Sequence, residues 1–187
     1  MAVEWNRELF DQLDWHWQNQ LRRRFDGLTD EEYFWEPVPG WSIRRRGEGR
    51  AQAEVGSGEY IMDFAYPEPD PAPVTTIAWR LGHIIVGAFG PRAAAHFCGP
   101  PMDHDSFAYA GTADEALDQL DKVYAAWSEG VRDLGPDGLA RPCGPAEGAF
   151  ATFPLAALIL HINREVIHHG AEISLLRDLY GARVADG

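Results

Sequence analysis

The sequence predicts an all-α fold, a four-helix bundle in which one long crossover connection joins the first helix to the second. Three observations lead to this prediction: four stretches with apolar residues every three or four positions, no regular alternation of helix and strand, and one long segment rich in proline and glycine. The length of 187 residues suits a single domain, 1–187, because domains usually run about 100–200 residues.

The first helix is expected over Val3–Asp26, where apolar residues recur at helical spacing and Gly27 ends the pattern. Residues 35–74 follow as the long connection, and they hold many of the 13 prolines, so they cannot form one continuous helix. Within the connection, Trp41–Arg45 and Tyr60–Tyr66 have weak strand character and could pair as a small β-hairpin.

The second helix is expected to begin at an N-cap, Thr75 or Thr76, and to run to Phe97, where a Gly-Pro-Pro sequence follows. A third begins at Thr112, which has a glutamate three residues later in capping-box spacing, and runs to about Leu134. Both helices are therefore bounded by recognisable start and stop signals.

The fourth helix is expected over Pro154–Tyr180, since proline is tolerated in a first turn and Gly181 provides a C-terminal stop. The longest apolar stretch of the chain, residues 153–162, overlaps its start. It is far shorter than the ~20 residues that span a bilayer, so no membrane partner is expected.

The formal charge of −13 argues against nucleic acid as a partner, because a field of that sign repels phosphate. The arginine runs 22–24 and 44–46 are interpreted as solvated faces. Cys98 and Cys143 are too few for a disulfide framework and are expected to be free thiols. No secretory signal is visible at the N-terminus, so a cytoplasmic location is expected.

The fourth helix gathers ionisable side chains on one face, within an arc of ~100° at ~100° per residue. Two of them, Glu165 and His169, fall inside the apolar stripe of the helix, whereas His161, His168 and Glu172 lie at its edge. A carboxylate and an imidazole four residues apart lie one turn apart, close enough to bind the same ion.

A buried carboxylate must be paired, neutralised or bound to metal. The face of the fourth helix therefore predicts either a metal site or a buried network in which Glu165 pairs with a protonated histidine or with an arginine such as Arg80. A metal needs a third ligand, and His83 of the second helix is the best candidate because small residues nearby, Gly87 and Gly90, would let another helix approach.

His96 and His104 are the competitors of His83 for the third ligand position. We expect His104, between two aspartates, to belong to a surface turn. His16 lies between two tryptophans and is expected to serve packing or the surface.

Residues 28–42, 75–84 and 161–180 resemble the DinB/YfiT-like superfamily, which includes mycothiol-dependent maleylpyruvate isomerase and bacillithiol transferases. The resemblance covers nearly the whole chain and implies a four-helix bundle of that type. It also implies a divalent metal site in which a histidine of the second helix joins two ligands one turn apart on the last, here His83, Glu165 and His169. The glutamate departs from the commonest three-histidine form and is similar to the His-Glu-His arrangement of the isomerase branch.

Two imidazoles and one carboxylate leave coordination positions open, and zinc, nickel or iron would suit them. The resemblance implies a thiol-dependent S-transferase or isomerase that uses a low-molecular-weight thiol such as mycothiol on a small-molecule substrate. A metal-dependent hydrolase and a non-catalytic bundle stay open, as does a homodimer. His161 and His168 are then expected beside the metal ligands, as proton carriers or hydrogen-bond partners. Specificity is expected to lie in residues 35–74 and 99–111.

Overall fold

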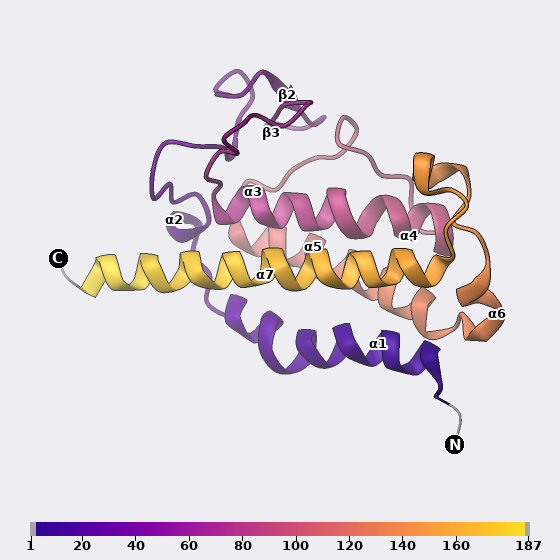
Figure 1. The fold of residues 1–187 in the computed structure, drawn as a ribbon. Coiled ribbons are helices and arrows are strands. Elements are labelled where there is room, and N and C mark those ends of the chain that lie inside the picture. Colours follow the sequence, from indigo (N-terminus) through magenta and orange to yellow (C-terminus); the bar gives the residue numbers. More distant parts are fainter. Residues whose placement is uncertain (1–2, 186–187) are drawn as a thin grey trace.

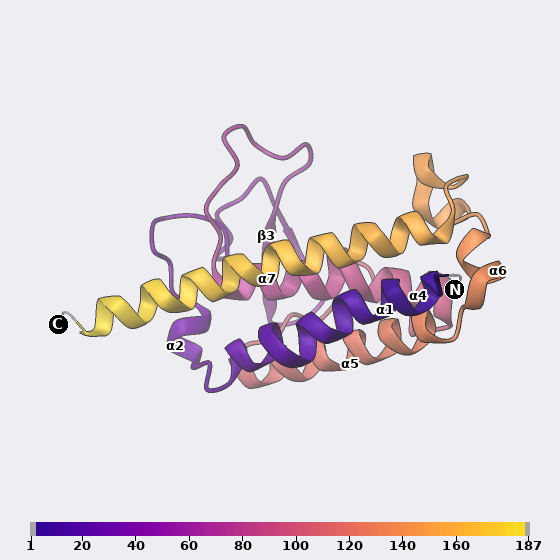
Figure 2. The same ribbon diagram turned by 60° about the horizontal axis from the view of Figure 1, so that its bottom comes forward.

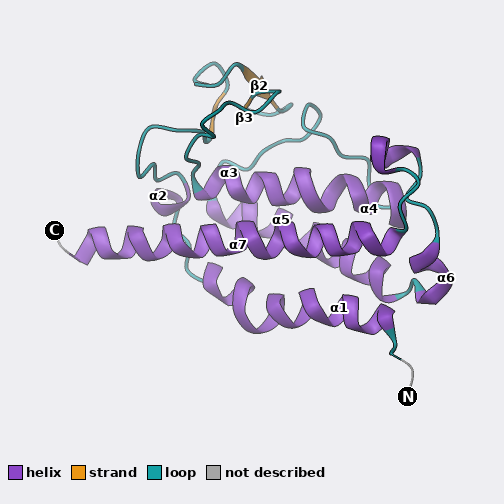
Figure 3. Cartoon of the chain, in the orientation of Figure 1, coloured by secondary structure: helices purple, strands orange, loops and turns teal. Residues whose placement is uncertain are grey.

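The computed structural model describes residues 3–185 and is mostly helical, with one small three-stranded sheet (Figures 1 and 3). Its helical elements are α1 (Trp5–His16), η1 (Trp17–Leu21), η2 (Arg22–Phe25), α2 (Asp30–Tyr33), α3 (Ile77–Gly82), η3 (His83–Phe89), α4 (Gly90–Phe97), α5 (Ala113–Arg132), α6 (Gly135–Ala140), η4 (Pro145–Phe150) and α7 (Leu155–Ala185). The strands are β1 (Ile43–Arg45), β2 (Ala53–Val55) and β3 (Tyr60–Phe64).

The first two predicted helices are each a run of three consecutive elements, α1–η1–η2 and α3–η3–α4. In both runs the middle element is a π-helix, which periodicity does not reveal. The predicted N-caps are confirmed, because the hydroxyl oxygen of Thr76 accepts from the backbone N–H of Trp79 and that of Thr112 accepts from Glu115.

The end of α7 differs from the prediction. The helix passes through Gly181 and continues to Ala185, so the expected stop is wrong. A glycine ends a helix when it adopts a left-handed backbone with positive φ. Gly181 is not one of the positive-φ glycines and lies in open space, so it behaves as an ordinary helical residue.

The long helical elements lie side by side around a common core (Figures 1 and 2). α7 contacts α1, α3 and η3, and α5 contacts α1, α3, η3 and α4. Aromatic rings fill the centre: Trp17 stacks on Tyr124 with ring centroids 3.8 Å apart, and the edge of Phe89 meets both. The contact between α7 and the α3–η3 run is the one that brings the predicted ligands together.

The long connection folds into an antiparallel sheet of strand order β1-β3-β2, on the outer side of α3 (Figure 1). β1 pairs with β3, with Ile43 opposite Met62, as the predicted hairpin requires. β2 is an additional strand that we did not expect, because its three residues lie in a polar segment with no strand pattern. The fold is thus helical with a small sheet rather than strictly all-α.

A buried carboxylate, that of Asp63, holds the connection together. It accepts hydrogen bonds from the backbone N–H groups of Ser42, Arg50 and Ala51, and from the guanidinium of Arg44. The Arg44 side chain is only 11% exposed and also pairs with Glu36. The interpretation of residues 44–46 as a wholly solvated run is therefore wrong for Arg44.

The same region anchors the start of α3. The indole N–H of Trp79 donates to the carbonyl of Asp63 over 2.8 Å, and the N–H of Thr76 donates to the carbonyl of Trp41 over 3.0 Å. His83 follows Trp79 by one turn, so the connection fixes the helix segment from which His83 projects. Within residues 3–185, no helix combines the length and the hydropathy that crossing a membrane requires.

The contact between Gly40 and Val74 provides a test of this anchoring. A Cβ at position 40 would lie 2.0 Å from the carbonyl oxygen of Val74, a backbone atom that also accepts from the N–H of Trp41. Gly40→Ala should therefore lower the free energy of unfolding by about 1–3 kcal/mol, measured by urea denaturation. Gly181→Ala is the matched control and should cause no loss, since no atom lies within 4 Å of its Cβ. Equal stabilities for the two variants would contradict the anchoring.

Candidate metal centre

His83 is the first residue of η3, at the junction with α3. Its imidazole stacks on the indole of Trp79, with ring centroids 5.3 Å apart and planes inclined by 7°. A Cβ at Gly87 would lie 2.9 Å from Nδ1 of His83, and a Cβ at Gly90 would lie 2.0 Å from the sulfur of Met102. The small residues therefore make room for the His83 ring and for Met102, and not for a neighbouring helix as we expected.

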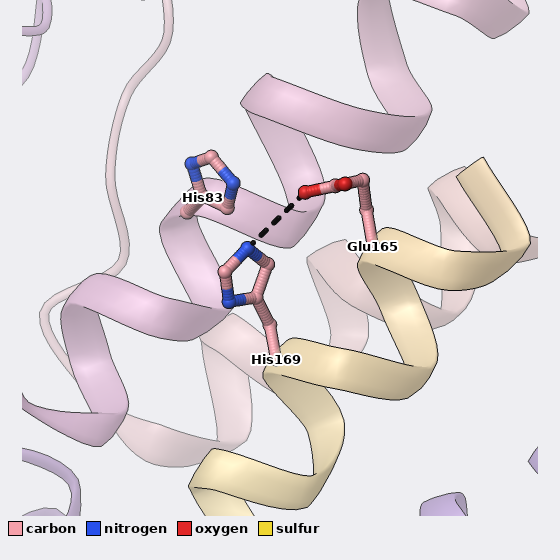
Figure 4. Close-up of side chains that lie close together, drawn as sticks. All are labelled: His83, Glu165 and His169. Atoms are coloured by element: carbon pink, nitrogen blue, oxygen red, sulfur yellow. Dashed lines mark ion pairs between the residues drawn. The ribbon is translucent and has the colours of Figure 1, made fainter. Parts of the chain in front are cut away.

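The other two predicted ligands project from the middle of α7 toward His83 (Figure 4). The rings of His83 and His169 are 4.6 Å apart and nearly perpendicular. Nε2 of His169 lies 3.4 Å from a carboxylate oxygen of Glu165. One ligand atom from each of the three residues can be chosen so that all lie within 4.8 Å of one another. At metal–ligand distances of ~2.0–2.2 Å, small side-chain rotations would suffice to reach one ion.

Burial determines the state of His83. Removal from water, together with the nearby His169 and Arg80, lowers the pKa of His83 to about 3. Its imidazole is thus neutral at physiological pH, and neutral imidazole is the form that coordinates metal.

His169 is held from behind by a carboxylate. Its Nδ1 lies 2.7 Å from Oε2 of Glu172, and Nε of Arg80 lies 3.0 Å from the same oxygen. When Nδ1–H donates to Glu172, Nε2 carries a lone pair toward the carboxylate of Glu165. Two acceptors 3.4 Å apart repel each other, so with this tautomer the geometry suits a cation between them. In the other tautomer Nδ1 would accept from Nη1 of Arg80, 3.3 Å away, and Nε2–H would face Glu165.

The predicted alternative in which Arg80 neutralises Glu165 is not what the structure shows. Arg80 forms its ion pair with Glu172, and the groups next to Glu165 are His169, His161 and the guanidinium of Arg164 at 3.7 Å. The side chain of Glu165 is 28% exposed and faces the site. Its nearest arginine, Arg164, is farther from it than Arg80 is from Glu172.

The two histidines predicted at the edge of the stripe surround the site from the solvent side. His161 is 43% exposed and its Nδ1 lies 3.4 Å from Glu165, whereas His168 is 65% exposed and lies 3.6 Å from Glu172. Each thus contacts a carboxylate of the cluster. Their role as proton carriers stays a prediction.

A second group, His168, His169 and Glu172, also has ligand atoms within 4.8 Å of one another. It is the poorer metal site, because the guanidinium of Arg80 already occupies Oε2 of Glu172 and would repel a cation there. In the group with His83, the guanidinium contacts are longer: Nη1 of Arg80 lies 3.3 Å from Nδ1 of His169, and Nε of Arg164 lies 3.7 Å from the carboxylate of Glu165.

The competitors of His83 have other partners. His96 pairs with Glu147 over 3.0 Å, and Nδ1 of His104 lies 3.0 Å from the hydroxyl of Tyr109. The turn after Met102 is built by the carboxylate of Asp103, which accepts from the next residues. His104 itself is half-buried, and burial lowers its pKa, so placing its side chain at the surface was wrong.

A cavity of about 380 Å³ adjoins the site, because His161 and Arg164 both line it and both lie beside Glu165. Its other walls come from α4, the segment 143–153 and the first turns of α7. None of its lining residues belongs to residues 35–74 or 99–111, where we expected specificity to lie. The sequence offered one overlooked signal, the apolar pair Phe150 and Phe153 in a polar, glycine-rich segment.

A family model described as the DinB superfamily matches residues 12–173. The match includes the sheet, the α3–η3–α4 run, and His83, Glu165 and His169. Neither a curated protein nor a solved structure matches the chain.

The carboxylate behind His169 can be tested directly. Glu172→Ala should weaken zinc binding by about 10–100-fold, since partners that orient a metal-bound histidine contribute that much. Competition with a chromophoric chelator measures the affinity. Glu129→Ala, which removes an exposed glutamate of α5, is the control for the change in net charge and should leave the affinity unchanged. Equal affinities for both variants would mean that Glu172 does not orient a ligand.

Proposed function

Because this chain belongs to the DinB superfamily, we propose that it is a four-helix-bundle metalloenzyme of one domain, with a single divalent ion bound by His83, Glu165 and His169. The convergence of these three side chains from two adjoining helical elements is the observation that carries the proposal. The residues suit a metal, since His83 is neutral and His169 is oriented by Glu172.

The donor set favours a catalytic over a structural metal. Two imidazoles and one carboxylate leave at least one coordination position free, and zinc or nickel, with iron as a third choice, accept such ligands. When bound, the ion would supply Lewis acidity that lowers the pKa of a coordinated water or thiol.

We propose a thiol-dependent S-transferase or isomerase as the reaction class, with a small thiol such as mycothiol and a small-molecule substrate. This choice rests on the resemblance of the His-Glu-His set to thiol-dependent members of the superfamily. The part of His161 would be to accept or donate a proton at its imidazole, because it contacts Glu165 and is partly open to solvent. His168 lies farther out and would act only through Glu172.

Two other classes remain as outcomes of the test. A hydrolase would use the same residues without a thiol, and a non-catalytic bundle would bind no metal or leave it no free position. Cytoplasmic location and a homodimer are further parts of the proposal, and each would leave the metal site unchanged.

A stability measurement separates the metal site from a buried proton network. An ion bound only by the folded chain stabilises it, so zinc at 100 times its dissociation constant should add about 2.7 kcal/mol. Thermal unfolding with and without zinc measures this increase, and His169→Ala should remove it. An identical melting curve with and without zinc would contradict the metal site and favour a network in which Glu165 pairs with a neighbouring histidine.

X-ray absorption separates thiol chemistry from hydrolysis. A small thiol added to the zinc form should bring a sulfur neighbour to ~2.3 Å from the metal. Cys98 and Cys143 must first be changed to serine, because Cys143 lines the adjoining cavity and could supply sulfur itself. His161→Ala should keep the sulfur signal. If the metal has only nitrogen and oxygen neighbours at millimolar thiol, the hydrolase or the non-catalytic bundle is favoured.

A further inference from the structure

We infer that the cavity beside the metal centre binds an organic carboxylate with an apolar body, held by Arg92 and Arg164. The volume of about 380 Å³ lies in the range of small-molecule sites. That this ligand is the substrate rests on the proposed function, whereas the binding itself can be tested without metal or turnover.

The lining of this cavity has more basic than acidic side chains, unlike the chain as a whole. The molecule has 29 acidic and 16 basic residues and a field that repels anions, whereas two guanidinium groups and one carboxylate line the cavity. Its only carboxylate, that of Glu147, is already engaged, since one oxygen lies 3.0 Å from His96 and the other 3.5 Å from Arg92. The two guanidinium groups outnumber this carboxylate, so the charged side chains of the lining carry a net positive charge.

Arg92 is held in position before any ligand arrives. Its Nε faces Glu147 and its Nη1 donates to the carbonyl of Gly87, the residue that packs against the ring of His83. No acceptor among residues 3–185 bonds to its Nη2. Arg164 contacts His161 through Nη2 and is 69% exposed, so its remaining N–H groups can reach a ligand at the end next to Glu165. Guanidinium groups match the planar geometry of a carboxylate.

Another part of the cavity wall is apolar and aromatic. The rings of Phe150 and Phe153 meet edge to face with centroids 5.5 Å apart, and they remain 61% and 49% exposed. Ala157 and Leu158 of α7 continue this wall toward His161. A ligand with an unsaturated or aromatic body would cover these surfaces while its carboxylate reaches the arginines, which inorganic phosphate would not do.

Binding of trans-cinnamate, its neutral analogue trans-cinnamamide and inorganic phosphate to the metal-free protein tests this inference by calorimetry. Cinnamate should bind about tenfold or more tightly than cinnamamide, because charge-assisted hydrogen bonds are lost with the amide. Phosphate should bind more weakly than cinnamate. Arg164→Met should reduce the preference for cinnamate about two- to fivefold, as expected of an exposed ion pair, and Arg92→Met about tenfold.

Arg7→Met is the matched control, since it removes an arginine that is 78% exposed and pairs with Asp11, and neither residue lines the cavity. It should leave the preference unchanged. If circular dichroism shows that Arg92→Met does not fold, the effect of Arg164→Met and the ratio of the affinities for cinnamate and cinnamamide still test the inference. Equal affinities for cinnamate and cinnamamide, equal binding of phosphate, no binding at millimolar concentration, or an equal effect of Arg7→Met would each overturn the inference.

Metal dependence distinguishes this inference from the proposed function. The contrary result is that cinnamate binds only with zinc, loses binding in His169→Ala and keeps its affinity when either arginine is replaced. That result would place the carboxylate on the metal and overturn the cavity site. Binding to the metal-free protein, combined with failure of thiols to enter the metal shell, would uphold the cavity while contradicting the thiol-dependent reaction.

Discussion

The cost of burying polar groups between α7 and the α3–η3 run is the constraint on which the site depends. Ile162, Val166 and Ile173 are fully buried and hold α7 against the core, so the intervening polar side chains must find partners within the contact. Arg80 and Glu172 satisfy each other and orient His169. What remains is a neutral His83, the free nitrogen of His169 and the carboxylate of Glu165, and their geometry suits a divalent cation.

The long connection supports this contact from the other side. Asp63 gathers backbone and arginine donors from across the sheet, and its own carbonyl accepts the indole N–H of Trp79. Trp79 in turn supports the ring of His83 by stacking. A segment that looks like a mere linker in the sequence therefore positions one of the three proposed ligands, over a chain of contacts between buried groups.

Helical periodicity predicted that Glu165 and His169 lie on the same, inward side of their helix, because a spacing of four residues and an apolar stripe are properties of one helix. The N-caps at Thr76 and Thr112 were readable for the same reason. Features that depend on distant residues were not readable: the pairing of Arg80 with Glu172 across two helices, the burial of Arg44, and the cavity between α4 and residues 143–153. Gly181 shows that a local signal can also mislead. The glycine was predicted to end the helix, but its backbone is not left-handed, so the helix continues through it.

A crystal structure of the zinc form, with anomalous scattering recorded at the zinc edge, tests the central claim most directly. The account predicts one anomalous peak per chain between η3 and α7, at ~2.0–2.2 Å from a nitrogen of His83, Nε2 of His169 and an oxygen of Glu165. Its second prediction is that Nδ1 of His169 keeps its contact with Glu172. The absence of a peak at this position, or a peak bound by His168 and Glu172 instead, would contradict the account.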